Sequence, residues 1–412
     1  MSSPIGLLSS LDLENLPPDL YNSREYCCLL VRVPSPIQLD VSAPDLFDRL
    51  ESIPASGGIY ALGRPGQPPH LSWSSNLRAR LRRLLASPNP GHDSLLTRLK
   101  ENLADVQCWP TTSRLETALL MHALSKQHFP GSYLAKLRLR MPWFITMTNE
   151  DAFARLVVIN RIPSPSSGVF GPFLTRDLAH EYEQRLLGLF QIRRCVDALV
   201  PAPDHPGCIY GEMSQCLRPC QAAVTSDEYA TEAARAGEFL LTNGKNMGNA
   251  LLMARDRAAE ATDFEQAAYL HKRLERVKEA GSARDPVIAE VGQFSGVALT
   301  RGVQPRQFRL WPLLAGYWQE PLTLDFSAEH SGAASLDQEL REKLRDALAM
   351  PSCDGNRVEE LAIFSRWYYS SWRDGFWLPF RTLADLNYRK LVREISNMVK
   401  EATEISIHGK PC

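Results

Sequence analysis

Four cysteines within one proline-rich stretch could serve as the ligands of a metal centre. Cys195, Cys208, Cys216 and Cys220 occur in the run RRCVDALVPAPDHPGCIYGEMSQCLRPC. Its prolines prevent one long helix with a continuous apolar face. Such a loop gains little from core burial, so a metal held by four thiolates would give it a physical reason to order.

Two kinds of centre fit these cysteines. Iron-sulfur clusters and closed zinc sites both use four thiolates. The gap from Cys195 to Cys208 is longer than zinc-finger spacing, which favours an iron-sulfur cluster, with structural zinc as the alternative. A third interpretation is that the cysteines are ordinary buried apolar residues. Four of the nine cysteines falling in one proline-broken segment argue against it.

A second group of residues is suited to phosphate contact. The run SGGIYALGRPGQPPHLSWSSNLRARLRRLL predicts a glycine-containing strand, a Gly/Pro turn, a second strand near residues 70–73, and a helix capped by Ser74 or Ser75. Arg78, Arg82 and Arg83 would form a basic face on this helix. Such a face is often only solvated surface, but with Arg80 it also suits DNA phosphates.

The pieces GGIY and NLRARL resemble the GIY-YIG nuclease domain of UvrC-type excinucleases and their shorter Cho-type relatives. The resemblance implies phosphodiester hydrolysis with one divalent cation, Mg2+ or Mn2+, and assigns Tyr60 as the first tyrosine and Arg80 as the catalytic arginine. His70 falls within the position of the second tyrosine motif, and Trp73 replaces a lysine. His70 could act as a base and Trp73 could stack on a base or sugar, with structural roles as the alternatives.

The metal site of this nuclease pattern is incomplete. In TSRLETALLMHALSKQHFPGSY the family's metal-binding glutamate falls on Met121, whose thioether cannot replace an oxygen ligand of Mg2+. Glu116 matches an earlier glutamate, and five residues along a helix turn a side chain to another face. The resemblance therefore predicts a weakened or lost nuclease. The alternative is an endonuclease that makes one incision with Tyr60, Arg80 and Glu116.

Two further segments carry the resemblance. GVFGPF followed by CIYGEMSQCLRPC is similar to the segment of UvrC-type proteins whose cysteines bind an iron-sulfur cluster. ATDFEQAAYLHKRL resembles the UVR motif, with Phe264, Glu265 and Ala268 matching best, which implies UvrB as a partner. Capping boxes at Thr225–Glu228 and at Thr262–Glu265 predict the flanking helices.

The C-terminal part has no assigned role. Strands are expected near residues 287–299 and 308–314, and helices near 336–349, from 358, and over 383–402, the last packing on the aromatic segment FSRWYYSSWRDGFWLPF. That segment suits either a core helix or stacking on exposed bases. Its aromatic and basic residues are Arg366, Trp367, Tyr368, Trp372 and Arg373.

The bulk composition restricts the class of protein. A net charge of −1 gives no overall basic signature, so nucleic-acid contacts must come from local patches. Neither a signal peptide nor a bilayer-spanning apolar run is recognisable, so we expect a soluble cytoplasmic protein with reduced cysteines and no membrane partner.

The predicted fold class is α/β multidomain, with a UvrC/Cho-like role in nucleotide excision repair on damaged duplex DNA. An iron-sulfur redox-sensing or partner-binding scaffold is a further alternative. The expected domains are an N-terminal arm (1–50), a degenerate GIY-YIG-like α/β domain (51–145), a cysteine-rich middle region (146–224), a helical region with a UVR-like hairpin (225–280) and an α+β C-terminal domain (287–412).

Overall fold

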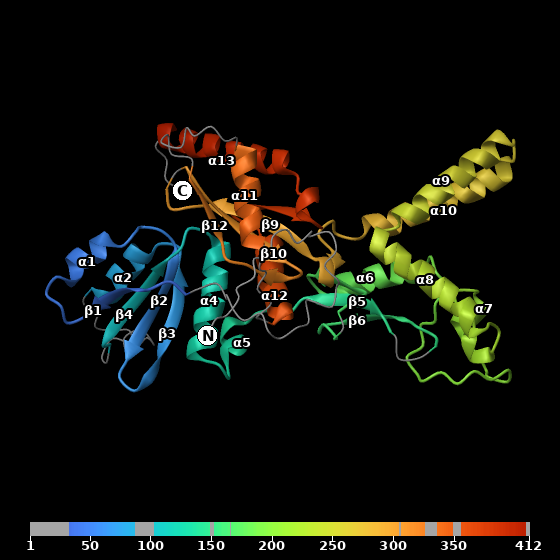
Figure 1. Ribbon diagram of the computed structural model, residues 1–412. Helices are drawn as coiled ribbons and strands as arrows, with labels where there is room; N and C mark the ends of the chain where they lie inside the picture. The colour runs from blue at the N-terminus through green and yellow to red at the C-terminus, as the bar shows by residue number, and fades with distance from the viewer. Residues whose placement is uncertain are drawn as a thin grey trace, which may run out of the picture.

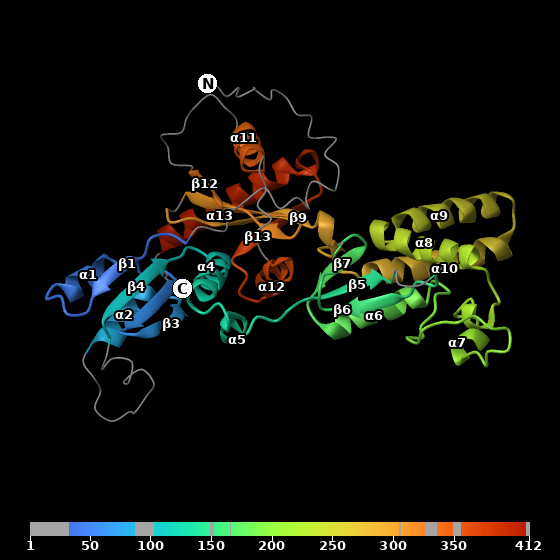
Figure 2. The ribbon, with the colours of Figure 1, turned by 60° about the horizontal axis from the view of Figure 1, so that its bottom comes forward.

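Three antiparallel sheets and an arm of helices make up the part of the chain that the structure describes. The computed structural model describes residues 33–86, 103–148, 152–164, 166–304, 306–325, 336–348 and 356–408. In Figure 1 the first sheet lies at the left, the C-terminal sheet in the centre, and the middle sheet with the helical arm at the right. Figure 2 shows the same succession from another side. The described residues therefore confirm a mixed α/β protein.

The first sheet has the strand order β1-β4-β2-β3. Its strands are β1 (Ile37–Asp40), β2 (Gly58–Arg64), β3 (Gln67–Ser74) and β4 (Asp105–Pro110), and its helices are α1 (Leu46–Ser52), α2 (Leu77–Leu85), α4 (Arg114–His128) and α5 (Tyr133–Leu137). β1 and α1 fall largely in the predicted N-terminal arm but contribute to the core of this sheet. The apolar run YCCLLVRV (residues 26–33), whose composition predicts a buried strand, lies almost wholly outside the described residues.

The two faces of β2 pack against different helices. Tyr60 and Leu62 share a cluster with the leucines of α2, whereas Ile59 and Ala61 pack with Leu120 and Leu124 of α4. This alternation follows from the two-residue period of a strand.

The start of α2 differs from the prediction. Asn76 caps it, because its side chain accepts the backbone N–H of Ala79 at 2.9 Å. The predicted cap at Ser74 or Ser75 was wrong: the Ser74 hydroxyl bonds the backbone of Asn76 instead.

The middle sheet has the order β6-β5-β7-β8 and carries α6 on it. These elements are β5 (Trp143–Met147), β6 (Leu156–Ile159), β7 (Val169–Phe173), α6 (Arg176–Leu187) and β8 (Ala289–Glu290). The GVFGPF piece forms β7, which is fully buried. Because β8 follows the helical arm in sequence, the chain returns to this sheet after leaving it.

Three helices form the arm, which projects to the right in Figure 1. They are α8 (Ser226–Thr242), α9 (Lys245–Glu260) and α10 (Phe264–Ser282). The Thr225–Glu228 capping box is confirmed. The Thr262–Glu265 box was wrong, because Asp263 caps α10 by accepting the N–H of Gln266. As predicted, α9 and α10 pair as a hairpin.

The C-terminal sheet has the order β11-β10-β9-β13, with β12 also pairing β10. Its elements are β9 (Ser295–Arg301), β10 (Gln307–Leu314), β11 (Tyr317–Trp318), β12 (Leu322–Asp325), α11 (Leu336–Leu348), α12 (Arg357–Tyr368), β13 (Gly375–Phe380) and α13 (Tyr388–His408). α12 packs on one face, in a core shared with the middle sheet, and α11 and α13 pack on the other.

Two predictions for this region were wrong, and one open alternative is decided for Trp367. GFWLPF is the strand β13 rather than part of a helix, because it pairs with residues 295–300 of β9. Trp367 is fully buried, which agrees with the core alternative for that residue. α13 packs with α11 on the face of the sheet opposite α12, so it does not cover the aromatic helix.

No helix in the described ranges has both the length and the apolar character required to cross a bilayer.

Two adjacent glutamates of α12 are buried, and one of them bonds the helices of the first sheet. Glu359 is 2% exposed and bonds a ring nitrogen of His122 at 2.8 Å and the hydroxyl of Tyr133 at 2.9 Å. Burial, and then the neighbouring Glu359, raise the pKa of Glu360 to about 7.

We expect Glu360→Gln to change how stability depends on pH. Between pH 4.5 and about 7 the unfolded Glu360 ionises while the folded one keeps its proton, so the wild type loses stability as pH rises. Glutamine removes this loss and should raise the free energy of unfolding by ~1–3 kcal/mol above pH 7, with little difference below pH 4.5. Denaturant unfolding across this pH range measures it. The exposed Glu342→Gln should show no such trend, and a constant offset for Glu360→Gln would contradict the explanation.

Candidate functional site

The cysteine segment is a loop held at several points of its backbone. Cys195 follows α6, Cys208 immediately precedes the short helix α7 (Ile209–Glu212), and Cys220 lies in the 3-10 helix η3 (Pro219–Gln221). The N–H of Ala202 donates to the carbonyl of Cys220 at 2.9 Å, which closes the proline-rich part into one loop.

The four thiols share one neighbourhood. Cys216 is buried, Cys195 and Cys220 are half-buried, and Cys208 is exposed, all with free thiols. Burial raises the pKa of Cys216, the backbone at Arg218 opposes this, and Cys208, Cys195 and Cys220 add to the rise because they lie within electrostatic range. In the same described residues, no group of three or more His, Cys, Asp or Glu side chains could hold a metal ion as placed. The thiols are thus gathered without forming a coordination shell, and the metal site stays a prediction.

Two arginines anchor this loop, and the sequence reasoning did not assign them a role. Arg193 is 3% exposed and donates to the carbonyl of Phe153 at 2.7 Å, to that of Asp197 at 3.0 Å, and to the Cys195 sulfur at 3.8 Å. Arg194 bonds the Leu187 carbonyl at 3.0 Å. The run RRC, with both arginines directly before Cys195, was the sequence signal that could have indicated this anchoring role. The positive guanidinium of Arg193 beside the Cys195 sulfur would complement the negative charge of a centre with thiolate ligands.

Tyr60 and Arg80 are brought together, as the resemblance implied. Tyr60 is buried on β2, and Nε of Arg80 on α2 donates to its hydroxyl at 3.2 Å. His70 of β3 lies opposite Leu62 of β2, which is on the same face of that strand as Tyr60. The side chains of His70 and Tyr60 are therefore both on the face of the sheet that α2 covers.

The charges around His70 are positive. Burial lowers the pKa of His70 first, and the cations Lys136, Arg64 and Arg80 lower it further. Burial and these cations both favour the neutral imidazole, and the same positive charges would repel a divalent cation and attract a phosphate.

The predicted basic face of α2 is partly neutralised. Arg82 pairs with Glu51 of α1 at 3.0 Å, and Arg78 lies 3.6 Å from the same carboxylate while donating to the Ile53 carbonyl. Arg83 is exposed and donates to the Ala79 carbonyl of its own helix. Of the three arginines, Arg83 is the one without a carboxylate partner in the described residues.

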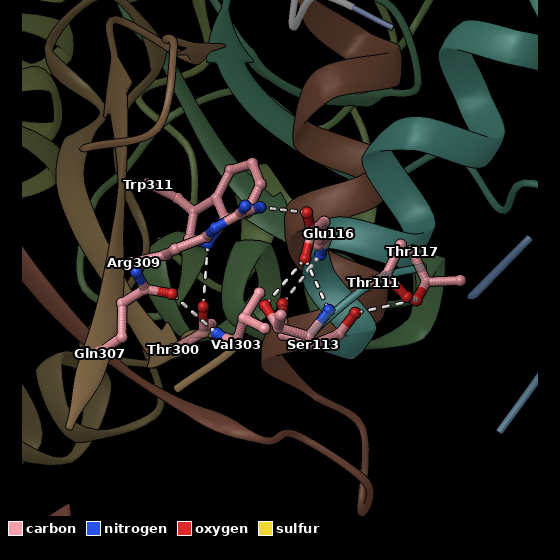
Figure 3. A network of polar contacts seen from close by, with 10 residues as sticks. Thr111, Ser113, Glu116, Thr117, Thr300, Val303, Gln307, Arg309 and Trp311 are labelled. Atoms are coloured by element: carbon pink, nitrogen blue, oxygen red, sulfur yellow. Dashed lines mark hydrogen bonds and ion pairs between the residues drawn. The ribbon is translucent and has the colours of Figure 1, made fainter. Parts of the chain in front are cut away.

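Glu116 lies apart from Tyr60. It is on α4, which covers the opposite face of the sheet, and Figure 3 shows it in a polar network. Its carboxylate accepts the N–H and hydroxyl of Thr112 at 2.7 and 2.9 Å and forms an ion pair with Arg309 of β10. In this structure Glu116 stabilises the start of α4 and its contact with the C-terminal sheet.

The other predicted residues have separate surroundings. Met121 packs in the apolar cluster of Ile59 and Ala61. Trp73 lies opposite Ile59, on the α4 face, and is 49% exposed. At the tip of the arm, Phe264 is 70% exposed, and Glu265 and Ala268 are exposed as well.

The chain is similar to excision-repair proteins. Residues 142–239 match the family model of the UvrC/Cho excinuclease middle domain. Three relatives are each called UvrABC system protein C. The protein of Syntrophus aciditrophicus is 25% identical over 237 residues, which are 57% of this chain and 38% of the relative. The proteins of Geobacter sp. strain M21 and Anaeromyxobacter sp. strain Fw109-5 are 26% identical over 271 residues (65% of this chain, 41% of the relative) and 27% identical over 286 residues (68% and 40%). The matches thus span about two fifths of these relatives' lengths. No solved structure matches. The resemblance to UvrC and Cho proteins is confirmed.

Tyr229 links the cysteine loop to the middle sheet, which gives a test of the loop's anchoring. Its buried hydroxyl accepts the N–H of Arg193 at 2.9 Å and donates to the Ala154 carbonyl at 2.8 Å. Tyr229→Phe removes the hydroxyl, so the Arg193 N–H and the Ala154 carbonyl lose their hydrogen-bond partner. The substitution should lower the free energy of unfolding by about 1–3 kcal/mol. The exposed Tyr269→Phe is the matched control. Equal unfolding midpoints for the two variants would contradict this role.

Proposed function

We propose that this chain acts in excision repair as a UvrC/Cho-like protein that binds damaged duplex DNA with a GIY-YIG-like domain that has lost its ordinary cleavage site. The observation that carries the proposal is the cationic surround of Tyr60 and His70. Arg64, Arg80 and Lys136 supply positive charge there. Duplex DNA is held largely through its phosphates, so this face suits it.

The groups that a nuclease metal would need are placed elsewhere. Glu116 is paired with Arg309 on the opposite side of the sheet, and Met121 offers a thioether in an apolar cluster. Mg2+ and Mn2+ prefer oxygen ligands, so these residues do not fit such a cation beside Tyr60. In the proposed role, Arg80 orients the Tyr60 hydroxyl and both contact a phosphate without cleaving it.

The four cysteines would hold an iron-sulfur cluster, with structural zinc as the alternative. The thiols are gathered around Cys216, and the Arg193 guanidinium donates to Cys195, which suits negatively charged sulfur ligands. Such a centre would fix the proline-rich loop in shape. The exposed tip of the hairpin, with Phe264, Glu265 and Ala268, would be the contact for UvrB.

DNA binding without cleavage is the first test. We expect the protein to bind a lesion-bearing duplex with Mg2+ or Mn2+ present and to leave it intact. Arg82→Ala with Arg83→Ala should weaken binding and reduce the salt slope by about two. Arg185→Ala, an exposed arginine paired with Glu181 on α6, is the control. Cleavage that disappears in Tyr60→Phe and Arg80→Ala would establish the active endonuclease instead, and absence of DNA affinity at moderate salt would favour the scaffold.

The cysteine centre has its own test. Protein purified without oxygen should be brown and contain iron and sulfide, and Cys216→Ser should lose the colour. Cys108→Ser is the control, because burial raises the pKa of that thiol to about 11 in a separate domain. Colourless protein with one equivalent of zinc would assign the same cysteines to structural zinc.

A further inference from the structure

An arginine lies between two indole rings where the first and C-terminal domains meet. The guanidinium carbon of Arg114, the first residue of α4, is 4.6 Å from the ring centroid of Trp73 on β3 and 5.9 Å from that of Trp372, which follows α12. The two tryptophans are far apart in sequence: Trp73 lies on a strand of the first sheet, and Trp372 lies in the turn between α12 and β13. We call Trp73, Arg114 and Trp372 the tryptophan clamp.

The backbone of the clamp is fixed from the C-terminal domain. Asp374 accepts the N–H of Arg114 at 2.5 Å through one carboxylate oxygen and the indole N–H of the buried Trp367 at 3.2 Å through the other. The position of Arg114 is therefore set without use of its guanidinium.

The side chains of the clamp are accessible. Trp73 is 49% and Trp372 is 41% exposed, and neither belongs to an apolar cluster of the described residues. Within the described chain Arg114 forms no ion pair, since the nearby Glu116 is bound to Arg309 and Asp374 receives backbone and indole donors. The half-buried Arg114 thus lies between two exposed indole rings with no ion pair in the described residues. Exposed large aromatic groups with a cation favour ligand binding over core packing.

We infer that the tryptophan clamp binds an unpaired segment of DNA, with bases stacked on the indole rings and a phosphate bonded to Arg114. A nucleotide supplies both a planar aromatic group and an anion, which are the two chemistries that the clamp can satisfy at once. The exposed Arg373 next to Trp372 adds positive charge for the continuing backbone. This inference rests on the proposed function, because it names the form of DNA that the protein recognises.

The test compares a fully paired duplex with the same duplex carrying a short unpaired bubble, by fluorescence anisotropy. We expect the wild type to prefer the bubble by tenfold or more. Trp73→Ala, Trp372→Ala and Arg114→Ala should each reduce bubble affinity by about tenfold and leave duplex affinity unchanged, and Trp372→Phe should retain most of it. Arg176→Ala is the matched control, because it removes an arginine that also lies over an indole ring outside the clamp. The guanidinium carbon of Arg176 is 5.5 Å from the ring centroid of Trp143 on the middle sheet.

Each outcome separates the two proposals. Equal affinity of the wild type for both DNAs overturns the clamp while leaving duplex binding in place. Binding to the bubble alone supports the clamp and removes the duplex-binding role, and failure to bind either DNA overturns both. Thermal unfolding of every variant identifies a purely structural role: if Trp372→Ala lowers the midpoint but keeps the bubble preference, the stack is only a domain contact and the inference is wrong.

Discussion

The attachment of helix α4 to the C-terminal domain is the contact on which the arrangement of the molecule depends. One side of α4 covers the first sheet through Leu120 and Leu124. Another side presents His122 to the buried Glu359, which also receives the hydroxyl of Tyr133. Removing one partner of such a buried polar pair leaves the other without compensation, which is costly. The helix therefore sets the position of the first sheet relative to the C-terminal domain.

This attachment bears directly on the candidate nuclease site. The ion pair between Glu116 and Arg309 is formed at the start of the same helix, where α4 meets β10. A carboxylate that contributes to domain attachment is not available as a metal ligand without breaking that contact. On the other face of the sheet, the residues around Tyr60 remain cationic. The two faces of the first sheet thus differ. The face covered by α4 contacts the C-terminal sheet, and the face with Tyr60 and His70 carries positive charge.

Local signals predicted most of the fold, and contacts between distant residues limited the rest. The β2–β3 hairpin and the Thr225–Glu228 cap follow from short sequence patterns. GFWLPF was assigned to a helix because its pairing with β9 is a long-range property that its own residues do not reveal. The pairing of Tyr60 with Arg80 was implied by motif resemblance, whereas the partner of Glu116 lies 193 residues away and no local spacing indicates it. The gathering of the cysteines agrees with the sequence pattern, but the pattern does not specify their relative geometry.

The helix α10 runs unbroken along the arm. Its 19 residues correspond to roughly 28 Å at 1.5 Å per residue. Phe264 lies at its free end, and Arg276, near the other end, bonds the carbonyl of Gly188 just after α6. A partner that bound Phe264 would thus hold one end of a single helix whose other half is bonded beside the start of the cysteine loop, which begins a few residues beyond Gly188.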